Sequence, residues 1–443
     1  MTAPALTWRG IARLGLVQTC LGAIVVIMTS TINRVMVVEL ALPAFIPGAL
    51  IALHYGVQVL RPRWGHGSDM GGRRTPWIVG GMAVLAAGGV GAALSVMLIA
   101  SHQTPGILCA AVSFLAVGMG VGAAGTSVLV LLASRVAREK RAAAATTVWV
   151  MMIAGFAVTA PLAGHFLEPY SPERLVLVTA CVAVIAFCVA ALAIRGVEGQ
   201  AGAQTAPAHA RAPFAQAIRE VWGEPRARRF TIFIFISMLA YSGQELILEP
   251  FAGVVFGMTP GATTKLSGVQ HGGVLFGMIF VSLAATLIGG RILGSLRMWT
   301  VAGCAASALA LGVIALGGMS GPDFPLRAAV GALGFSNGVF AVAAIGSMMA
   351  LANAGREARE GTRMGLWGAA QGIAFGAGGF AGTVAVDIAR HFAGPPVNAY
   401  ALVFLAEAAL FIFAALLAAR IGEARAPARE RAADPSHSIA AAT

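Results

Sequence analysis

The chain has 443 residues, of which 58% are hydrophobic and 11% charged, and its formal net charge is +12. A soluble globular domain carries about 25% charged residues. The composition therefore excludes a soluble protein and predicts one that crosses a membrane many times. The five cysteines lie in apolar runs without Cys-x-x-Cys spacing, which favours small buried side chains over a disulfide framework or a metal site.

Twelve stretches are apolar over the roughly 20 residues that a membrane-spanning helix needs. We expect them at about 12–32, 40–60, 77–100, 107–133, 146–167, 174–194, 229–252, 269–290, 299–319, 327–352, 364–389 and 397–420. The chain runs directly into the first of them, and we expect that span to be retained and not cleaved as a signal sequence. The predicted fold is an all-α membrane protein of twelve transmembrane helices.

A long segment rich in Ala, Gly, Gln and Arg divides the spans into six and six, the layout of the major facilitator superfamily fold. The predicted organisation is a six-helix half over 1–194, a cytoplasmic linker over 195–228, a second half over 229–421 and a disordered tail over 422–443. Within the linker, Pro213–Phe230 has apolar residues at helical spacing among basic ones. This pattern predicts an amphipathic helix on the inner membrane face.

The basic residues predict the orientation of the chain. If both termini face the cytoplasm, all but five of the 30 Lys and Arg lie in cytoplasmic segments, the exceptions being Arg34, Arg174, Lys265, Arg327 and Arg390. The positive-inside rule favours this arrangement. The net charge is then a consequence of topology, and no nucleic acid is expected as a partner.

The segment between the second and third predicted spans reads Gly-x-x-x-Asp-x-x-Gly-Arg-Arg and resembles the cytoplasmic loop at this place in the major facilitator superfamily. The pattern consists of Gly65, Asp69, Gly72, Arg73 and Arg74. The glycines permit a tight turn and the arginines favour the cytoplasmic side. Met70 stands where the superfamily usually has an arginine. The alternative is an ordinary loop that follows the positive-inside rule.

Polar side chains inside predicted spans are candidates for function, because burying them in hydrocarbon is costly. The candidates for ligand binding are His54, Gln244, Glu245, Glu249, Asn337 and Gln371. Glu245 and Glu249 are four residues apart and share a helix face. Two such carboxylates cannot both carry a charge cheaply, so we expect one to be protonated, paired with a base or bound to a cation.

Each candidate also has a purely structural interpretation. His54 can hydrogen-bond a neighbouring helix, and Glu249 is expected at the periplasmic boundary in contact with solvent. Asp387 is expected to pair with Arg390 at the same boundary, and Glu407 lies within the last span. A separate polar cluster in the short first periplasmic turn comprises Asn33, Arg34 and Glu39.

No enzymatic motif is present in the sequence. It contains no Gly-Lys-Ser/Thr phosphate loop, no Gly-x-Ser-x-Gly and no His-Glu-x-x-His. We therefore expect neither catalysis nor a bound nucleotide.

Two stretches resemble the PucC/LhaA family of phototrophic bacteria, a branch of the major facilitator superfamily. The first is NRVMVVELALPAFIPGALIALHYGVQVLRPRWGHGSDMGGRRTPW, which begins at Asn33. The second is GQELILEPFAGVVFGM, in which Glu245 replaces the family's usual Asp and Val254 its second Gly. The compact loop GHGSDMGGRRTPW is most similar to the branch linked to bacteriochlorophyll synthesis, whose members are historically called a bacteriochlorophyll synthase chain.

The resemblance implies that the protein binds bacteriochlorophyll, or its geranylgeranylated precursor, and delivers it during assembly of light-harvesting and reaction-centre complexes in the bacterial inner (intracytoplasmic) membrane. His54 or Glu245 would supply an axial ligand to the pigment magnesium. The implied partners are the bacteriochlorophyll synthase, the light-harvesting and reaction-centre subunits, a membrane insertase and the lipid bilayer. Two alternatives stay open: a proton-coupled transporter of small solutes, which the scarcity of charge in the first half disfavours, and a scaffold without a ligand.

Overall fold

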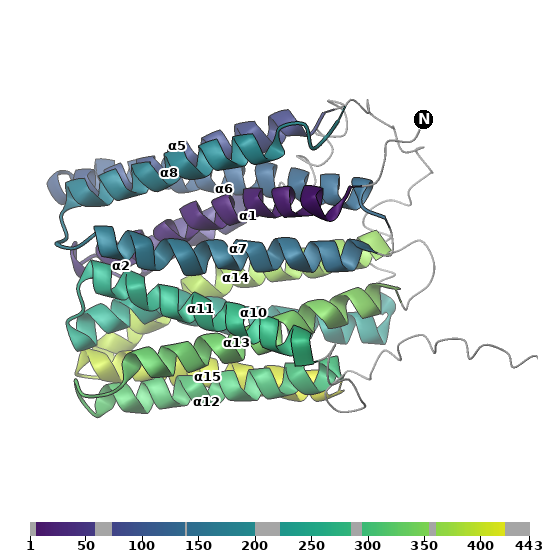
Figure 1. Cartoon of the computed structure of the whole chain (residues 1–443). Helices are drawn as coiled ribbons and strands as arrows, with labels where there is room; N and C mark the ends of the chain where they lie inside the picture. The colour runs from purple at the N-terminus through teal and green to yellow at the C-terminus, as the bar shows by residue number, and fades with distance from the viewer. Residues whose placement is uncertain are drawn as a thin grey trace, which may run out of the picture.

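The protein is a bundle of long helices that run along one common direction (Figure 1). The computed structural model describes residues 6–57, 73–137, 140–199, 222–284, 295–353 and 360–420. The N-terminal group of helices comprises α1 (Trp8–Val26), η1 (Ile27–Ile32), α2 (Asn33–Val38), α3 (Phe45–Val57), α5 (Thr75–Ser101), α6 (Gln103–Arg135), α7 (Arg141–Phe166) and α8 (Pro172–Ile194). The C-terminal group comprises α10 (Pro225–Phe256), α11 (Pro260–Leu283), α12 (Leu296–Met319), α13 (Leu326–Asn353), α14 (Glu360–Phe392) and α15 (Pro396–Arg420).

The prediction of twelve spans is confirmed. Within the described residues, 11 helices are long and apolar enough to cross a membrane, and the shorter apolar helix α3 occupies the position of the second predicted span. The predicted linker helix lies mostly outside the described residues, as does the tail beyond residue 420. The end of that predicted helix, from Pro225 on, belongs to α10, so the seventh span begins earlier than residue 229.

Two predicted boundaries differ from the structure by six residues or more, and several others by about one turn. The first span continues through the π-helical segment η1 to Val38, so the region expected as a periplasmic turn is helical. No Pro or Gly interrupts the chain there, and a π-helical segment absorbs the irregularity without ending the helix. The eighth span begins at Pro260 and not at 269, because the Thr259 hydroxyl caps the helix by accepting from the Ala262 N–H at 3.2 Å.

Each group of helices has its own apolar core. One core runs from Ile11 to Val197 and also includes Leu246 of α10, and the other runs from Ala227 to Ala418. Glycines let neighbouring helices approach closely: a Cβ added at Gly88 of α5 would lie 2.9 Å from the Val117 nitrogen of α6. Such contacts are typical of helices packed in lipid, where small residues replace the hydrophobic drive that operates in water.

The two groups meet along pairs of helices. The helix α7 packs along α11, α3 packs along α14, and η1 and α2 contact α10. In Figure 1, α7 and α11 lie next to each other at the middle of the bundle. A small apolar cluster that includes Ile153, Val274 and Val339 fills this junction.

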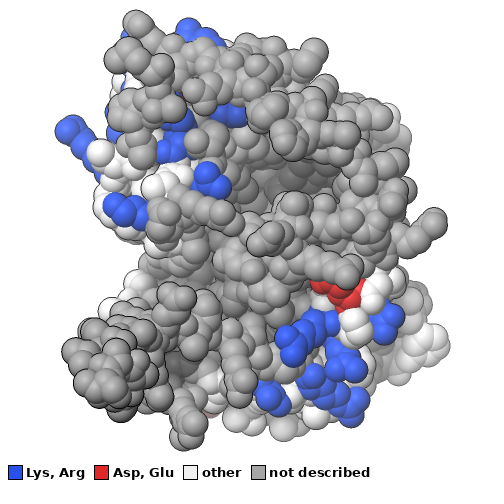
Figure 2. Space-filling model, turned by 90° about the vertical axis from the view of Figure 1, so that its right-hand side faces the viewer, with Lys and Arg blue, Asp and Glu red and all other residues white. Residues whose placement is uncertain are grey.

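The two ends of the bundle differ in charge. The terminal end, where α1 begins and α15 ends, carries among its described residues Arg9, Arg13, Arg73, Arg74, Arg135, Lys140, Arg141, Arg195, Arg226, Arg228, Arg229, Arg297 and Arg420. Figure 2 views this end and shows Lys and Arg over both groups, with little acidic surface among the described atoms. The opposite end of the bundle carries the five basic residues that the predicted orientation places outside the cytoplasm: Arg34, Arg174, Lys265, Arg327 and Arg390.

Candidate ligand site between the two groups of helices

The helix α10 organises the site because it is buried on nearly all sides. From Ser242 to Gly253 every residue except Glu245 is buried. A helix that is buried all round lies in the interior of a protein, and α10 packs against α14 and α15 in its own group and against η1 and α2 in the other. Polar residues on this stretch of α10 therefore lie at the junction of the two groups.

Glu245 forms an acid–imidazole pair with His271 of α11. Its Oε1 lies 3.5 Å from the His271 Nε2. The other ring nitrogen of His271, Nδ1, lies 2.9 Å from the Ser267 carbonyl oxygen. Because a carbonyl only accepts, we assign a ring N–H to Nδ1, and Nε2 then faces the Glu245 carboxyl group, a contact that is attractive when one proton lies between the two. Phe156 of α7 contacts the imidazole edge-to-face, with 4.9 Å between ring centroids.

The Glu245 side chain faces a small cavity between the groups. Its lining comes from both groups: Thr29, Tyr55, Ser242, Glu245, Leu246 and Phe375. The cavity has a volume of about 10 Å³, which is room for little more than one water molecule. Tyr55 and Phe375 close it from α3 and α14, with their ring centroids 5.4 Å apart.

Glu249 is buried, so the expectation that it lies at a solvated boundary is wrong. It is 3% exposed and accepts a hydrogen bond from the Ser30 hydroxyl in η1. Nearby, the hydroxyls of Thr31 and Thr264 are 3.0 Å apart. The physical reason is the longer first helix, because its continuation through η1 carries a run of hydroxyl side chains to the buried face of α10.

The other predicted ligand residues do not converge on this cavity. His54 is 1% exposed, and its neighbour Tyr55 lines the cavity in its place. The Asn337 Oδ1 accepts from the Ser307 hydroxyl at 2.9 Å, between α13 and α12. Gln371 contacts the Met238 sulfur at 3.9 Å.

Gln244 and Glu407 are buried, and within the described residues their side-chain oxygen and nitrogen atoms have no hydrogen-bond partner. Glu407 of α15 lies against two glycines: a Cβ added at Gly243 would be 2.3 Å from its Oε1, and one at Gly382 would be 3.3 Å away. Glycine at these two positions leaves the space that the carboxyl occupies.

The cluster of Asn33, Arg34 and Glu39 is local in part, as the sequence suggested, because Arg34 pairs with Glu39, and it also joins the two groups. Arg34 pairs with Glu39 and also donates from Nη2 to the Met258 carbonyl oxygen at 2.6 Å. Asn33 donates to the Leu246 carbonyl oxygen at 2.8 Å. These bonds hold the opposite end of α1–α2 against α10.

A second contact at the same end replaces the predicted Asp387–Arg390 pair. Asp387 of α14 accepts from the backbone N–H groups of Ala44 and Phe45, at 3.1 and 2.7 Å, where α3 begins. Arg390 instead donates to the Tyr400 hydroxyl at 2.8 Å. A carboxylate at a helix N-terminus satisfies free N–H groups and the helix dipole, so the neighbouring helix outcompetes the arginine.

The loop motif is only partly described. Gly65, Asp69 and Gly72 lie outside the described residues, while Arg73 and Arg74 precede α5 at the terminal end. There Glu198 accepts from the backbone N–H groups of Arg74 and Thr75 at 2.5 and 2.9 Å. Burial alone would raise the pKa of Glu198, but hydrogen bonds from the Thr75 hydroxyl and these N–H groups outweigh it and hold the pKa below its usual value.

Comparison with known proteins places the chain in a family. It is 54% identical to the "Bacteriochlorophyll synthase 44.5 kDa chain" of Rhodobacter capsulatus, over 96% of this chain and 98% of that protein. It is 33% identical to "Protein PucC" of Rhodovulum sulfidophilum, over 85% of each chain.

Solved structures with the same fold include a POT family transporter in complex with a thioalcohol conjugated peptide, with a TM-score of 0.68 at 12% identity over 94% of this chain and 97% of that one. The nucleoside transporter NupG has a TM-score of 0.64 at 13% identity over 93% and 98%. These likenesses show the fold of the major facilitator superfamily, and the protein is a multi-pass membrane protein. The profile described as "PUCC protein" matches residues 31–426, so the chain belongs to the PUCC protein family.

Proposed function

We propose that this protein takes part in the assembly of photosynthetic complexes by binding bacteriochlorophyll, or a precursor of it, within the membrane and delivering it to light-harvesting and reaction-centre subunits. The observation that carries the proposal is the Glu245–His271 pair at the junction of the two groups, in a chain that is 54% identical to a protein named for bacteriochlorophyll. Its partners in this role are the bacteriochlorophyll synthase, a membrane insertase and those subunits. We further propose an inner-membrane location with both termini in the cytoplasm.

The donor chemistry at the site suits the pigment. Magnesium accepts one axial ligand from an oxygen or nitrogen donor, and Glu245, which faces the cavity, offers one. Within the described residues no group of three or more His, Cys, Asp or Glu side chains is placed to hold a metal ion. The pair provides a single donor, which is enough for a metal that its macrocycle already holds.

The volume of the site does not suit the pigment in this conformation. A cavity of about 10 Å³ cannot admit a macrocycle. Pigment binding there requires the N-terminal group, whose α3 carries Tyr55, to move away from α10 and α14 of the other group. The hydrogen bonds of Asn33 and Arg34 join the groups at the opposite end, so we expect separation to occur at the terminal end.

We propose a carrier and not an enzyme, although the name of the 54% identical relative includes the word synthase. The sequence has no motif for catalysis or nucleotide binding, and the fold is that of membrane transporters. The purified chain, supplied with a bacteriochlorophyllide and geranylgeranyl diphosphate, should form no ester. Esterification activity that co-purifies with the protein and disappears in a Glu245→Ala variant would contradict this.

The test of pigment binding is the absorption spectrum of gently purified protein from a phototrophic host, with the pigments identified by chromatography. Wild-type protein should carry near-stoichiometric pigment, and Glu245→Ala and His271→Ala should each lose most of it. The matched controls are Glu173→Ala and His165→Ala, both exposed and outside the site. Colourless protein that retains antenna or synthase subunits would favour a scaffold, and colourless protein without them would favour a solute transporter.

A further inference from the structure

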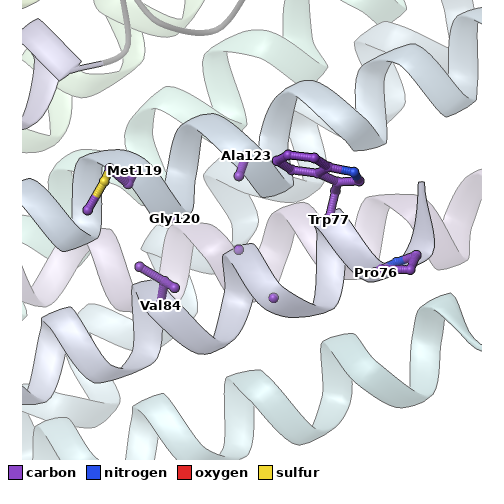
Figure 3. Close-up of a pocket in the computed structure, with 8 residues that line it drawn as sticks. Pro76, Trp77, Val84, Met119, Gly120 and Ala123 are labelled. Carbon is purple, nitrogen blue, oxygen red and sulfur yellow. The ribbon is translucent and has the colours of Figure 1, made fainter. Parts of the chain in front are cut away.

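A groove lies on the outer face of the N-terminal group, between α5 and α6, away from the site at the junction. It has a volume of about 330 Å³ and is lined mainly by Pro76, Trp77, Gly80, Val84, Met119 and Ala123. Figure 3 shows Pro76 and Trp77 at one end of the groove and Val84 and Met119 at the other. The lining is therefore almost entirely apolar, with one indole at the end that lies nearest the start of α5.

Glycines form both the floor and the opening of this groove. Gly81 and Gly120 bring the two helices together: a Cβ added at Gly81 would lie 2.7 Å from the Ala124 nitrogen, and one at Gly120 would lie 2.6 Å from the Leu85 nitrogen. Gly80, in contrast, has no atom within 4 Å of an added Cβ. The space above Gly80 is thus open toward the outside of the bundle.

The groove faces the hydrocarbon of the bilayer. Val84 and Met119 are 40% and 44% exposed, on helices whose composition and length suit a membrane span. An apolar groove in this position is filled by hydrocarbon, because no water is present to fill it. Its Trp77 end lies in the first turn of α5 at the terminal end, the depth at which tryptophan marks the membrane–water interface.

The charge at that end of the groove is positive. The exposed Arg73 directly precedes α5, followed by Arg74. Arg135 at the end of α6 donates to the Glu198 carbonyl oxygen at 2.6 Å. Among the described residues, Glu198 is the acidic group in this cluster, and its carboxylate is already held by the N–H groups of Arg74 and Thr75. Within the described part of the chain this cluster has three arginines and one carboxylate, and the exposed Arg73 is the group that faces an anion at the headgroup level.

We propose that this groove is a binding site for an anionic phospholipid, with an acyl chain between α5 and α6 against Trp77 and Gly80 and the phosphate headgroup beside Arg73. Basic sites between helices on the side with the positive residues favour anionic headgroups. The pigment of the proposed function is a poorer occupant, because the side chains of the lining offer no oxygen or nitrogen lone pair for magnesium. The inference does not depend on the proposed function.

Fluorescence quenching by brominated lipids tests the site directly. Delipidated protein is placed in vesicles of phosphatidylcholine that contain increasing fractions of dibrominated phosphatidylglycerol or, separately, dibrominated phosphatidylcholine with the same chains. The chain has 7 tryptophans, so the Trp77 contribution is taken as the difference between wild type and Trp77→Phe. We expect this contribution to be quenched at about a fivefold lower fraction of the anionic lipid, the preference that one arginine near the headgroup confers.

Two variants distinguish binding of the acyl chain from binding of the lipid headgroup. Gly80→Leu fills the groove where an added side chain meets no neighbour, and it should abolish the preferential quenching of Trp77. Gly312→Leu, on α12, also meets no neighbour within 4 Å and should change nothing. Arg73→Gln should bring the ratio between the two lipids close to one while quenching by both persists.

Three results would overturn the proposal. One is equal quenching of Trp77 by the two lipids in wild-type protein. Another is unchanged preference in Gly80→Leu. The third is stoichiometric displacement of brominated lipid from Trp77 by added bacteriochlorophyll, which would make the groove a site for the pigment tail. Each result leaves the pigment test at Glu245 and His271 unaffected, so failure of one proposal is distinguishable from failure of the other.

Discussion

Glu245 of α10 and His271 of α11 face each other across 3.5 Å, with the imidazole held from its other side by the Ser267 carbonyl oxygen. His271 is 2% exposed, whereas Glu245 reaches the cavity at the junction of the two groups. The imidazole is thus held in place, and the carboxyl group is the member of the pair that faces the cavity. In the proposed function, His271 would position Glu245.

The pairing of these two residues predicts a coupling energy. Glu245→Gln and His271→Gln should each lower the stability of the protein in mild detergent by about 1–3 kcal/mol, since each leaves the other without its partner. The double variant should lose less than the sum, with a coupling of at least about 0.5 kcal/mol. Apparent unfolding midpoints of the four proteins check this, and strictly additive losses would show that the pair does not interact.

Gly243 and Glu407 predict a second coupling, between α10 and α15. An alanine at Gly243 places its Cβ 2.3 Å from the Glu407 Oε1, so Gly243→Ala should cost about 1–3 kcal/mol through overpacking. Adding Glu407→Ala removes the clash and should restore most of the loss.

The control for this pair is Gly272→Ala in α11, where an added Cβ meets nothing within 4 Å. There the gain in helix propensity should make the change neutral or slightly stabilising. The midpoints of thermal unfolding, measured as the loss of monodisperse protein, give the comparison between these variants. If the Glu407→Ala background leaves the penalty of Gly243→Ala unchanged, the contact is not the cause.

The twelve helices were predictable because hydrocarbon demands about 20 apolar residues for each span. The exact ends were less so. The polar run Thr29–Thr31 resembles the end of a span, yet it is helical because its hydroxyls meet α10 and α11, as Ser30 does with Glu249 and Thr31 with Thr264. That outcome depends on partners more than 200 residues away in the sequence, which local composition does not contain.

The candidate site was half predictable. Glu245 was found from its cost in the membrane, and His271 carries the same signal, because it is an ionisable residue inside the predicted span 269–290. Their pairing depends on how α11 is rotated, which the packing of Gly268 against Pro161 of α7 fixes: an added Cβ there would lie 2.5 Å from the proline Cδ. In the same way, the sequence of its own span does not determine that the His54 side chain is buried inside the bundle.

The contact of Glu198 with the start of α5 predicts a pH dependence. The pKa of Glu198 is lowered in the folded protein, so its contribution is fully present above the unfolded value of about 4.3 and is lost as the pH falls through the folded value. At pH 7, Glu198→Gln should cost about 1 kcal/mol, as the loss of a helix cap does. The difference from wild type should be constant from pH 8 to 5 and shrink below about pH 4.

The comparison for Glu198 is Glu173→Gln, an exposed residue in the first turn of α8. That change should cost at most about 0.5 kcal/mol. Unfolding midpoints measured at several pH values decide the matter. A Glu198→Gln penalty that stays the same at pH 3.5 would mean that the carboxylate charge is not what stabilises the start of α5.

The contacts of Arg34 suggest what keeps the bundle closed at the end opposite to the two termini. It pairs with Glu39 in its own group and donates to the Met258 carbonyl oxygen of the other group at 2.6 Å. Arg34→Gln removes a charged hydrogen bond between the groups, worth about 1.5 kcal/mol or more. The population open at this end should then rise about tenfold.

The opening is measured by labelling a cysteine introduced as Thr264→Cys, a position that is 1% exposed, with a polar maleimide in detergent. The parent chain without this cysteine supplies the background from the native thiols. We expect labelling about tenfold faster in the Arg34→Gln background and unchanged in Arg327→Gln, an exposed arginine at the same end. Glu39→Gln should have a smaller effect, because the bond to Met258 remains. Equal labelling rates in the Arg34 and Arg327 variants would show that the opposite end is held closed by packing alone, without help from this arginine.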